Sequence, residues 1–165
     1  MTGGDTLCIE RVTVGHSHVE ALVRVPPGAA ARTSAVPGLA AAALAALPGL
    51  GRHRCACGSA RGIAAELADT ETPHLLEHVA LELMALAGSP RSLEGETRWD
   101  FAVDGPSVYH VRIGYDDDLV ALGALREAAG IVETLLRAEP AGPAVDAAVT
   151  RLEAARRTPA GPHSD

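Results

Sequence analysis

The sequence predicts an α+β fold, a two-layer sandwich of antiparallel strand pairs with helices on one face. Two observations carry this expectation. Segments that alternate apolar and polar residues occur as one pair near the N-terminus and as a second pair after residue 95. Alanine- and leucine-rich segments typical of helices fill the stretch between the pairs and follow the second one. The expected order is two strands, several helices, two strands and a helix.

The first strand pair is expected over residues 7–14 and 18–25, and the second over residues 96–103 and 107–115. Period-two alternation predicts one face of the strand over 96–103, composed of Thr97, Trp99, Phe101 and Val103. Asp104-Gly105 predicts a tight hairpin turn between the last two strands.

Helices are expected over residues 39–47, 63–68, 73–87 and 144–157, with another after Asp116-Asp117-Asp118. In the helix over 73–87, Thr72 is expected to cap the first turn and Pro73 to occupy it. The aspartates favour a helix N-terminus because its dipole attracts negative charge. The apolar stripe of that helix is predicted to be Leu119, Leu122, Leu125, Ala129, Val132 and Leu136.

Length and composition limit the classes of protein. The 165 residues are predicted to form a single domain over residues 1–157 with a disordered tail over 158–165. A net charge of −7 argues against nucleic acid as partner, because phosphate binding needs cations. No stretch is apolar enough to suggest a membrane span. Three cysteines and no recognisable leader indicate reduced thiols and a cytoplasmic location, and a homo-oligomer is compatible with the sequence.

The segment with the clearest chemistry lies on the helix over 73–87. At about 100° per residue, the side chains of His74, Glu77, His78 and Glu82 fall on one stripe of a largely apolar helix. A solvated polar face is the alternative, but such faces usually pair Glu with Arg or Lys one turn away. No cation accompanies this stripe, which favours a functional site.

Two histidines four residues apart can bind one metal ion, and His-x-x-Glu-His is the order found in inverted zinc peptidases. In this interpretation His74 and His78 bind Zn²⁺ and Glu77 activates water. The further ligand stays open. Glu82 is one turn beyond His78, and the loop that follows residue 50 offers His53, Cys55 or Cys57.

Three side chains in the second strand pair suggest a second polar surface. Arg98, His110 and Arg112 are expected on the sheet face opposite Trp99 and Tyr109. Arg98 and Arg112 are candidates for binding substrate carboxylates, and a solvated sheet face is the alternative.

The sequence also resembles the N-terminal domain of cyanophycin synthetase. The most specific block is the one that runs from His74 to Leu83. Supporting blocks are Val36-Pro37-Gly38-Leu39, Leu47-Pro48-Gly49-Leu50, His53-Arg54-Cys55, Leu86-Ala87-Gly88, Gly95-Glu96-Thr97-Arg98 and Val108-Tyr109-His110-Val111. Full synthetases of that family add two ATP-using ligase domains, and this chain contains no phosphate-binding loop and no lysine, so ATP-dependent synthesis by this chain alone is not expected.

The resemblance implies contact with a polymer of poly-aspartate backbone that carries arginine on each side-chain carboxyl. In some members the domain resembles a metal-dependent hydrolase, which implies His74 and His78 as zinc ligands, Glu77 as general base, and Glu82 and His53 as further candidates for metal binding. The acidic balance suits an arginine-rich peptide or polymer. Two alternatives remain: a non-catalytic module that binds such a polymer or docks onto a separately encoded ligase, and a purely structural domain.

Overall fold

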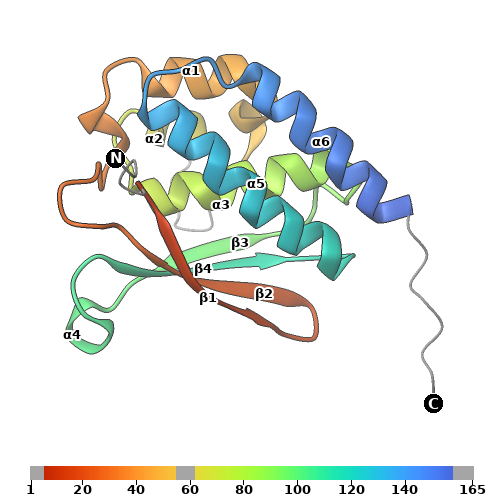
Figure 1. Ribbon diagram of the computed structural model, residues 1–165, viewed down its shortest axis with the longest axis horizontal. Coiled ribbons are helices and arrows are strands. Elements are labelled where there is room, and N and C mark those ends of the chain that lie inside the picture. The colour runs from red at the N-terminus through yellow and green to blue at the C-terminus, as the bar shows by residue number, and fades with distance from the viewer. Residues whose placement is uncertain (1–5, 55–61, 158–165) are drawn as a thin grey trace, which may run out of the picture.

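The computed structural model describes residues 6–54 and 62–157. Within them the chain forms one four-stranded antiparallel sheet with helices on one side, which confirms the predicted α+β class (Figure 1). The tail predicted over 158–165, and Cys55 and Cys57, lie outside the described residues.

The sheet has the order β1-β2-β4-β3, so the two strand pairs meet along β2 and β4. Its strands are β1 (Cys8–Val14), β2 (His18–Arg24), β3 (Gly95–Arg98) and β4 (Val108–Gly114). Alternation places Val19, Ala21 and Val23 on the helix-covered face, fully buried. The short strand β3 is an edge of the sheet, and it pairs Thr97 with Val111.

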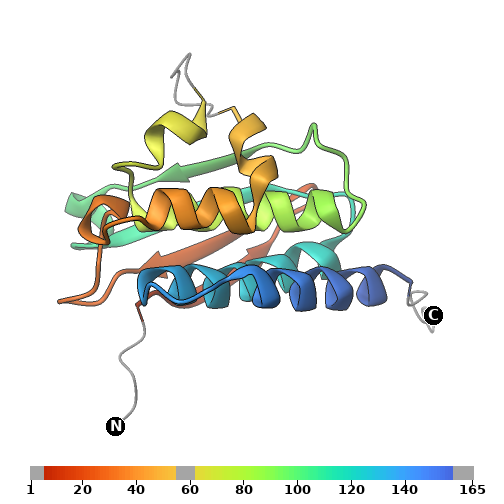
Figure 2. The same cartoon turned by 90° about the horizontal axis from the view of Figure 1, so that it is seen from above.

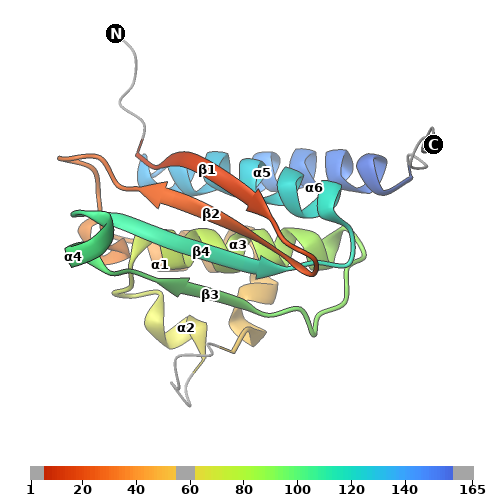
Figure 3. The ribbon, with the colours of Figure 1, turned by 90° about the horizontal axis from the view of Figure 1, so that it is seen from below.

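Helix α3 is the central helix of the layer that covers the sheet. The helices are α1 (Leu39–Ala46), α2 (Ile63–Glu66), α3 (Thr72–Leu86), α4 (Phe101–Asp104), α5 (Asp118–Leu136) and α6 (Gly142–Arg157), with 3₁₀ turns η1 (Thr33–Ala35) and η2 (Pro48–Arg52). Helix α3 packs against β3 and β4, α5 packs against α3 and β2, and α6 packs on α5 and α3 (Figure 2). From the opposite side the four strands lie in front of the helices (Figure 3).

The strand predicted over residues 96–103 is wrong beyond Arg98. The side chain of Asp100 accepts hydrogen bonds from the backbone nitrogens of Ala102 and Val103, and this cap starts the short helix α4 in place of more strand. The chain then passes Gly105 at φ 88° and Ser107 at φ 62° before β4 begins. The two strands are therefore joined by a long connection, and the tight turn predicted at Asp104-Gly105 does not form.

Two details of the helices also differ from the prediction. The hydroxyl of Thr72 donates to the carbonyl of Ala30 at 2.7 Å and does not cap α3. Leu119, predicted on the apolar stripe of α5, is 58% exposed. Leu125 and Val132 of the predicted stripe are buried as expected. The complete buried stripe is rich in alanine, which allows close approach to α3, and consists of Val120, Ala121, Ala124, Leu125, Ala128, Ile131, Val132 and Leu135.

No helix in the described ranges is long and apolar enough to cross a membrane.

Candidate metal centre

The polar stripe of helix α3 lies inside the protein. Every residue from Thr72 to Met84 is buried, and His74, Glu77, His78 and Glu82 are exposed by only 8%, 3%, 2% and 1%. The alternative of a solvated polar face is therefore wrong. Burying four ionisable groups on one helix is costly unless each has a partner or a bound ion.

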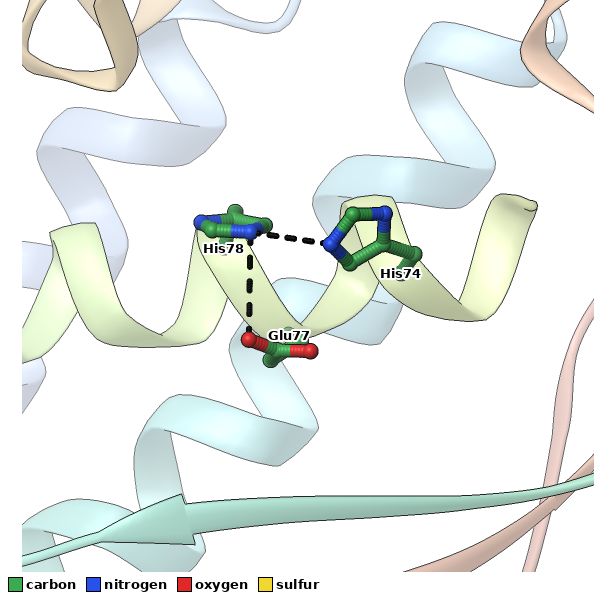
Figure 4. A group of neighbouring side chains, drawn as sticks. All are labelled: His74, Glu77 and His78. Atoms are coloured by element: carbon green, nitrogen blue, oxygen red, sulfur yellow. Dashed lines mark hydrogen bonds and ion pairs between the residues drawn. The ribbon is translucent and has the colours of Figure 1, made fainter. Parts of the chain in front are cut away.

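His74, Glu77 and His78 form the core of the centre (Figure 4). The Nε2 atoms of His74 and His78 are 3.1 Å apart, and Oε1 of Glu77 lies 3.8 Å from Nε2 of His78. One potential ligand atom from each residue lies within 4.8 Å of the other two. The helical spacing predicted from the sequence thus brings these three side chains to one point.

The outer ring nitrogens of both histidines are held by other side chains. The hydroxyl of Thr70 lies 2.8 Å from Nδ1 of His74, and Nδ1 of His53 lies 3.1 Å from Nδ1 of His78. Nε2 of His53 in turn contacts a carboxylate oxygen of Glu82 at 2.7 Å. These contacts orient both imidazole rings in the way that groups behind a metal ligand do.

One arrangement of protons satisfies this whole chain of contacts. Protons on the Nδ1 atoms of His74 and His78 donate to Thr70 and His53, and a proton on Nε2 of His53 donates to Glu82. Both Nε2 lone pairs are then directed at the position between His74 and His78. This is the tautomer that metal binding through Nε2 requires.

His53 and Glu82, predicted as further metal ligands, take a different place. They lie behind His78, on the side of its Nδ1 atom, whereas His74 faces its Nε2 atom. Glu82 also accepts two hydrogen bonds from Arg91, at 2.9 and 3.3 Å. Burial opposes its ionisation, but the hydrogen bonds from His53 and Arg91 outweigh burial and lower the pKa of Glu82. In this conformation the pair orients His78.

Burial sets the charge of the core residues. It lowers the pKa of His74, and for His78 burial together with the nearby His74 and His53 lowers the pKa to about 3. Both imidazoles are therefore neutral at physiological pH, as metal ligands must be. Burial raises the pKa of Glu77 to about 7, against the opposing effect of a hydrogen bond from Thr97. A carboxyl group with this pKa is suited to take and return protons near neutral pH.

Strand β3 positions Glu77. The hydroxyl of Thr97 donates to Oε2 of Glu77 at 2.6 Å, which leaves Oε1 facing His78. Gly95 supplies the room, because a Cβ atom there would lie 2.6 Å from Oε1. Gly49 does the same for Glu82, where a Cβ atom would lie 1.8 Å from the carboxylate.

The donor set fits a zinc ion. Two neutral imidazole nitrogens 3.1 Å apart, with a carboxylate oxygen beside them, match the nitrogen and oxygen ligands that catalytic zinc sites use. The contacts of Thr70 and His53 with the outer ring nitrogens also fit, because histidines that bind zinc are usually held through their other nitrogen. His74 and His78 would hold the ion, and Glu77 is close enough to act as a third ligand or as a base.

A cavity of about 530 Å³ opens beside the centre. Glu77 and His78 line it together with Leu81 and Ala85 of the same helix. One wall is the segment 52–54 at the end of η2, and the other is the segment 90–95 that leads into β3. A substrate in this cavity would have direct access to Glu77 and His78.

The family model for the cyanophycin synthase-like N-terminal domain matches residues 22–137, from β2 to the end of α5. This match spans more than half of the chain. The chain belongs to that family. No curated protein matches the chain. The matched region contains all residues of the cluster and of the cavity.

In this cyanophycin synthase-like domain, the predicted substrate-binding residues Arg98 and Arg112 lie away from the centre. Thr97 faces Glu77, so Arg98, the next residue on β3, points to the opposite face of the sheet. There Arg98 pairs with Glu20 at 3.2 Å, and Arg112 contacts His18 at 3.2 Å. Neither residue lines the cavity that contains Glu77.

Several residues of the site were not predicted as such. Thr70, Thr97 and Gly95 contact or make room for the core side chains from segments before and after α3. A signal was present for two of them, because Gly95 and Thr97 lie in one of the sequence blocks on which the predicted resemblance rests. Arg91, Arg52 and Arg54 line the cavity without having been singled out as ligand-binding residues.

Proposed function

We propose that this chain is a metal-dependent hydrolase of peptide or isopeptide amide bonds, in a cyanophycin-like polymer or a related peptide. The observation that carries the proposal is the pair of Nε2 atoms of His74 and His78 at 3.1 Å, with Oε1 of Glu77 3.8 Å from the His78 nitrogen and an open cavity beside them. A buried cluster with this donor set and a substrate-sized opening is typical of hydrolytic metal sites.

Each residue has a distinct role in the proposed reaction. A zinc ion held by His74 and His78 would supply Lewis-acid polarisation of water and of the amide carbonyl. Glu77 takes a proton from the attacking water at Oε1 as the new carbon–oxygen bond forms. The same carboxyl group returns that proton to the leaving nitrogen as the carbon–nitrogen bond breaks. Thr97, His53 and Thr70 keep the three side chains oriented.

The test combines zinc content with turnover. The full chain is purified without chelator, and zinc is measured beside release of free amines from peptides with a poly-aspartate backbone and arginine on the side-chain carboxyls. Glu77→Gln should retain zinc and lose at least a hundredfold in hydrolysis, because the amide cannot accept the proton. Loss of zinc in Glu77→Gln would make Glu77 a ligand. Unchanged hydrolysis in that variant would overturn the proposal.

The second candidate is a module that binds the polymer or peptide without cleaving it, or that docks onto a separately encoded ligase. The observation that favours it is the cavity wall with three arginines, which suits retention of a chain through its carboxylates. Tight binding with no turnover, unchanged when His74 and Glu77 are replaced, would support this candidate over the hydrolase.

A further inference from the structure

The charge of the cavity differs from the charge of the whole chain. The chain has a net charge of −7, yet the cavity wall carries Arg52 and Arg54 on one side and Arg91 on the other. The acidic residues that line the cavity are Glu77, in its buried part, and Glu94. An arginine-rich ligand, which the overall charge predicts, would therefore meet three arginines around the candidate active site.

Arg91 is fixed in place while part of it stays accessible. Its two terminal nitrogens contact the carboxylate of Glu82 at 2.9 and 3.3 Å, and 48% of its side chain remains exposed. Because Glu82 also receives a hydrogen bond from His53, this arginine is tied to the group that orients His78. These two bonds leave other N–H groups of the guanidinium unused, and Arg91 is one of the residues that line the cavity.

Arg52 and Arg54 flank His53 and are both exposed. Neither of them has an acidic partner within the described part of the chain. Guanidinium groups bind carboxylates through paired hydrogen bonds, and cations without an internal partner are the ones free to do so. Arg52 and Arg54, together with the half-exposed guanidinium of Arg91, surround a cavity that also holds Glu77 and form a site for an anion beside the reacting bond.

We propose that Arg52, Arg54 and Arg91 form a carboxylate-binding subsite, so that this cavity selects peptides with a carboxylate close to the amide bond at Glu77. The cleavage part of this statement rests on the proposed function, whereas the binding part does not. The carboxylate has two sources, an aspartyl or glutamyl side chain and the C-terminus of the bound peptide. Both are recognised by the same guanidinium chemistry.

Binding without turnover tests the subsite. The full-length Glu77→Gln chain, loaded with zinc, is titrated with four N-acetylated six-residue alanine–glycine peptides. One has a free C-terminus, one is C-amidated with a single Asp, one is C-amidated and neutral, and one is C-amidated with a single Arg. At least one carboxylate peptide should bind tenfold or more tighter than the neutral peptide, and the Arg peptide no tighter than the neutral one. Preference for the free C-terminus or for Asp identifies the source of the carboxylate.

Matched arginine variants complete the test. Arg52→Ala/Arg54→Ala should weaken binding of the preferred carboxylate peptide at least tenfold, so that the preference disappears. Binding of the neutral peptide should stay unchanged. Arg126→Ala/Arg137→Ala removes the same charge from α5 and its C-cap, outside the cavity, and should keep the preference. The proposal is overturned if the two double variants behave alike, or if the Arg peptide binds best. Zinc content is measured in parallel, so a chain without zinc that still prefers carboxylates would refute the hydrolase and retain the subsite.

Discussion

A hydrogen bond of 2.6 Å from Thr97 on edge strand β3 to Glu77 on helix α3 joins the sheet to the candidate centre. It links two segments that lie far apart in the sequence, and it holds the only carboxylate of the three-residue cluster found among the described residues. Burial raises the pKa of Glu77 to about 7 in spite of this bond, which opposes the rise. Thr97 thus both orients Glu77 and limits how far burial can favour its protonated form.

Thr97→Val should therefore raise the pKa of Glu77 above 7. A hydrogen bond to a charged group contributes about 1.5–3 kcal/mol, so we expect a rise of about one pH unit or more. The measurement is a titration of the Glu77 carboxyl carbon by NMR in the metal-free chain. Thr134→Val, which removes a hydroxyl that donates to the carbonyl of Gly130 within α5, is the control and should leave the titration unchanged. An unchanged or lower pKa in Thr97→Val would contradict the role given to this bond.

Zinc binding should depend on both helix histidines. We expect about one zinc per chain in the wild type, and almost none in His74→Ala or His78→Ala, because each variant removes one of two neighbouring nitrogen ligands. Zinc should also raise the free energy of unfolding of the wild type, by about 2.7 kcal/mol at a hundredfold excess over Kd. His110→Ala is the control, since His110 contacts Glu20 and Asp104 and not the centre. Equal zinc content in all four proteins would refute the site.

The metal-free protein should show a pH dependence that Glu77→Gln changes in a defined direction. The folded-state pKa of Glu77, about 7, lies above its ordinary 4.5, so its contribution to stability is present below pH 4.5 and is lost as pH rises to 7. His78 acts oppositely, because its folded pKa of about 3 lies below 6.5, and its contribution is lost as pH falls below 6.5. Between pH 4.5 and 6.5 the contribution of Glu77 to the free energy of unfolding falls with pH while that of His78 rises, so these two pH dependences cancel.

Glu77→Gln removes one of these two opposing effects. Relative to the wild type, the variant should gain stability as pH rises from 4.5 to 7, by about 3 kcal/mol, since each pH unit of pKa difference corresponds to about 1.36 kcal/mol. Urea unfolding with chelator present at pH 4.5, 5.5, 6.5 and 7.5 measures the difference. If the difference in free energy of unfolding between Glu77→Gln and the wild type stays constant with pH, the pKa of Glu77 is not raised in the folded chain.

The sequence predicted the core of the centre because that core lies within one helix. The spacing of His74, Glu77 and His78 follows from helical periodicity, so their convergence could be inferred without knowing the fold. The contacts behind them could not, although His53 was named as a candidate ligand. Thr97 and His53 reach the centre from segments on either side of α3, and only the fold decides which of their atoms meet Glu77 and His78.

The errors in the fold have local causes of a similar kind. Alternating residues after Arg98 predicted more strand, but the cap formed by Asp100 outweighed that pattern and produced α4. On α5, the predicted apolar stripe shares Leu125 and Val132 with the buried one but wrongly includes Leu119. The true stripe is rich in alanine because α5 packs closely on α3, and Leu119 is left exposed. Packing between helices, which a single sequence does not specify, decided that orientation.

Gly95 should be required for the position of Glu77. A Cβ atom at residue 95 would lie 2.6 Å from Oε1 and 2.7 Å from Cγ of Glu77, so Gly95→Ala must displace this side chain and break its bond to Thr97. We expect a loss of stability of about 1–3 kcal/mol from overpacking and at least a hundredfold loss of hydrolysis, with zinc content retained by His74 and His78. Gly130→Ala is the matched control, since a Cβ there meets no atom within 4 Å, and it should stabilise α5 slightly. Wild-type hydrolysis by a folded Gly95→Ala chain would mean that Glu77 does not act from the position seen here.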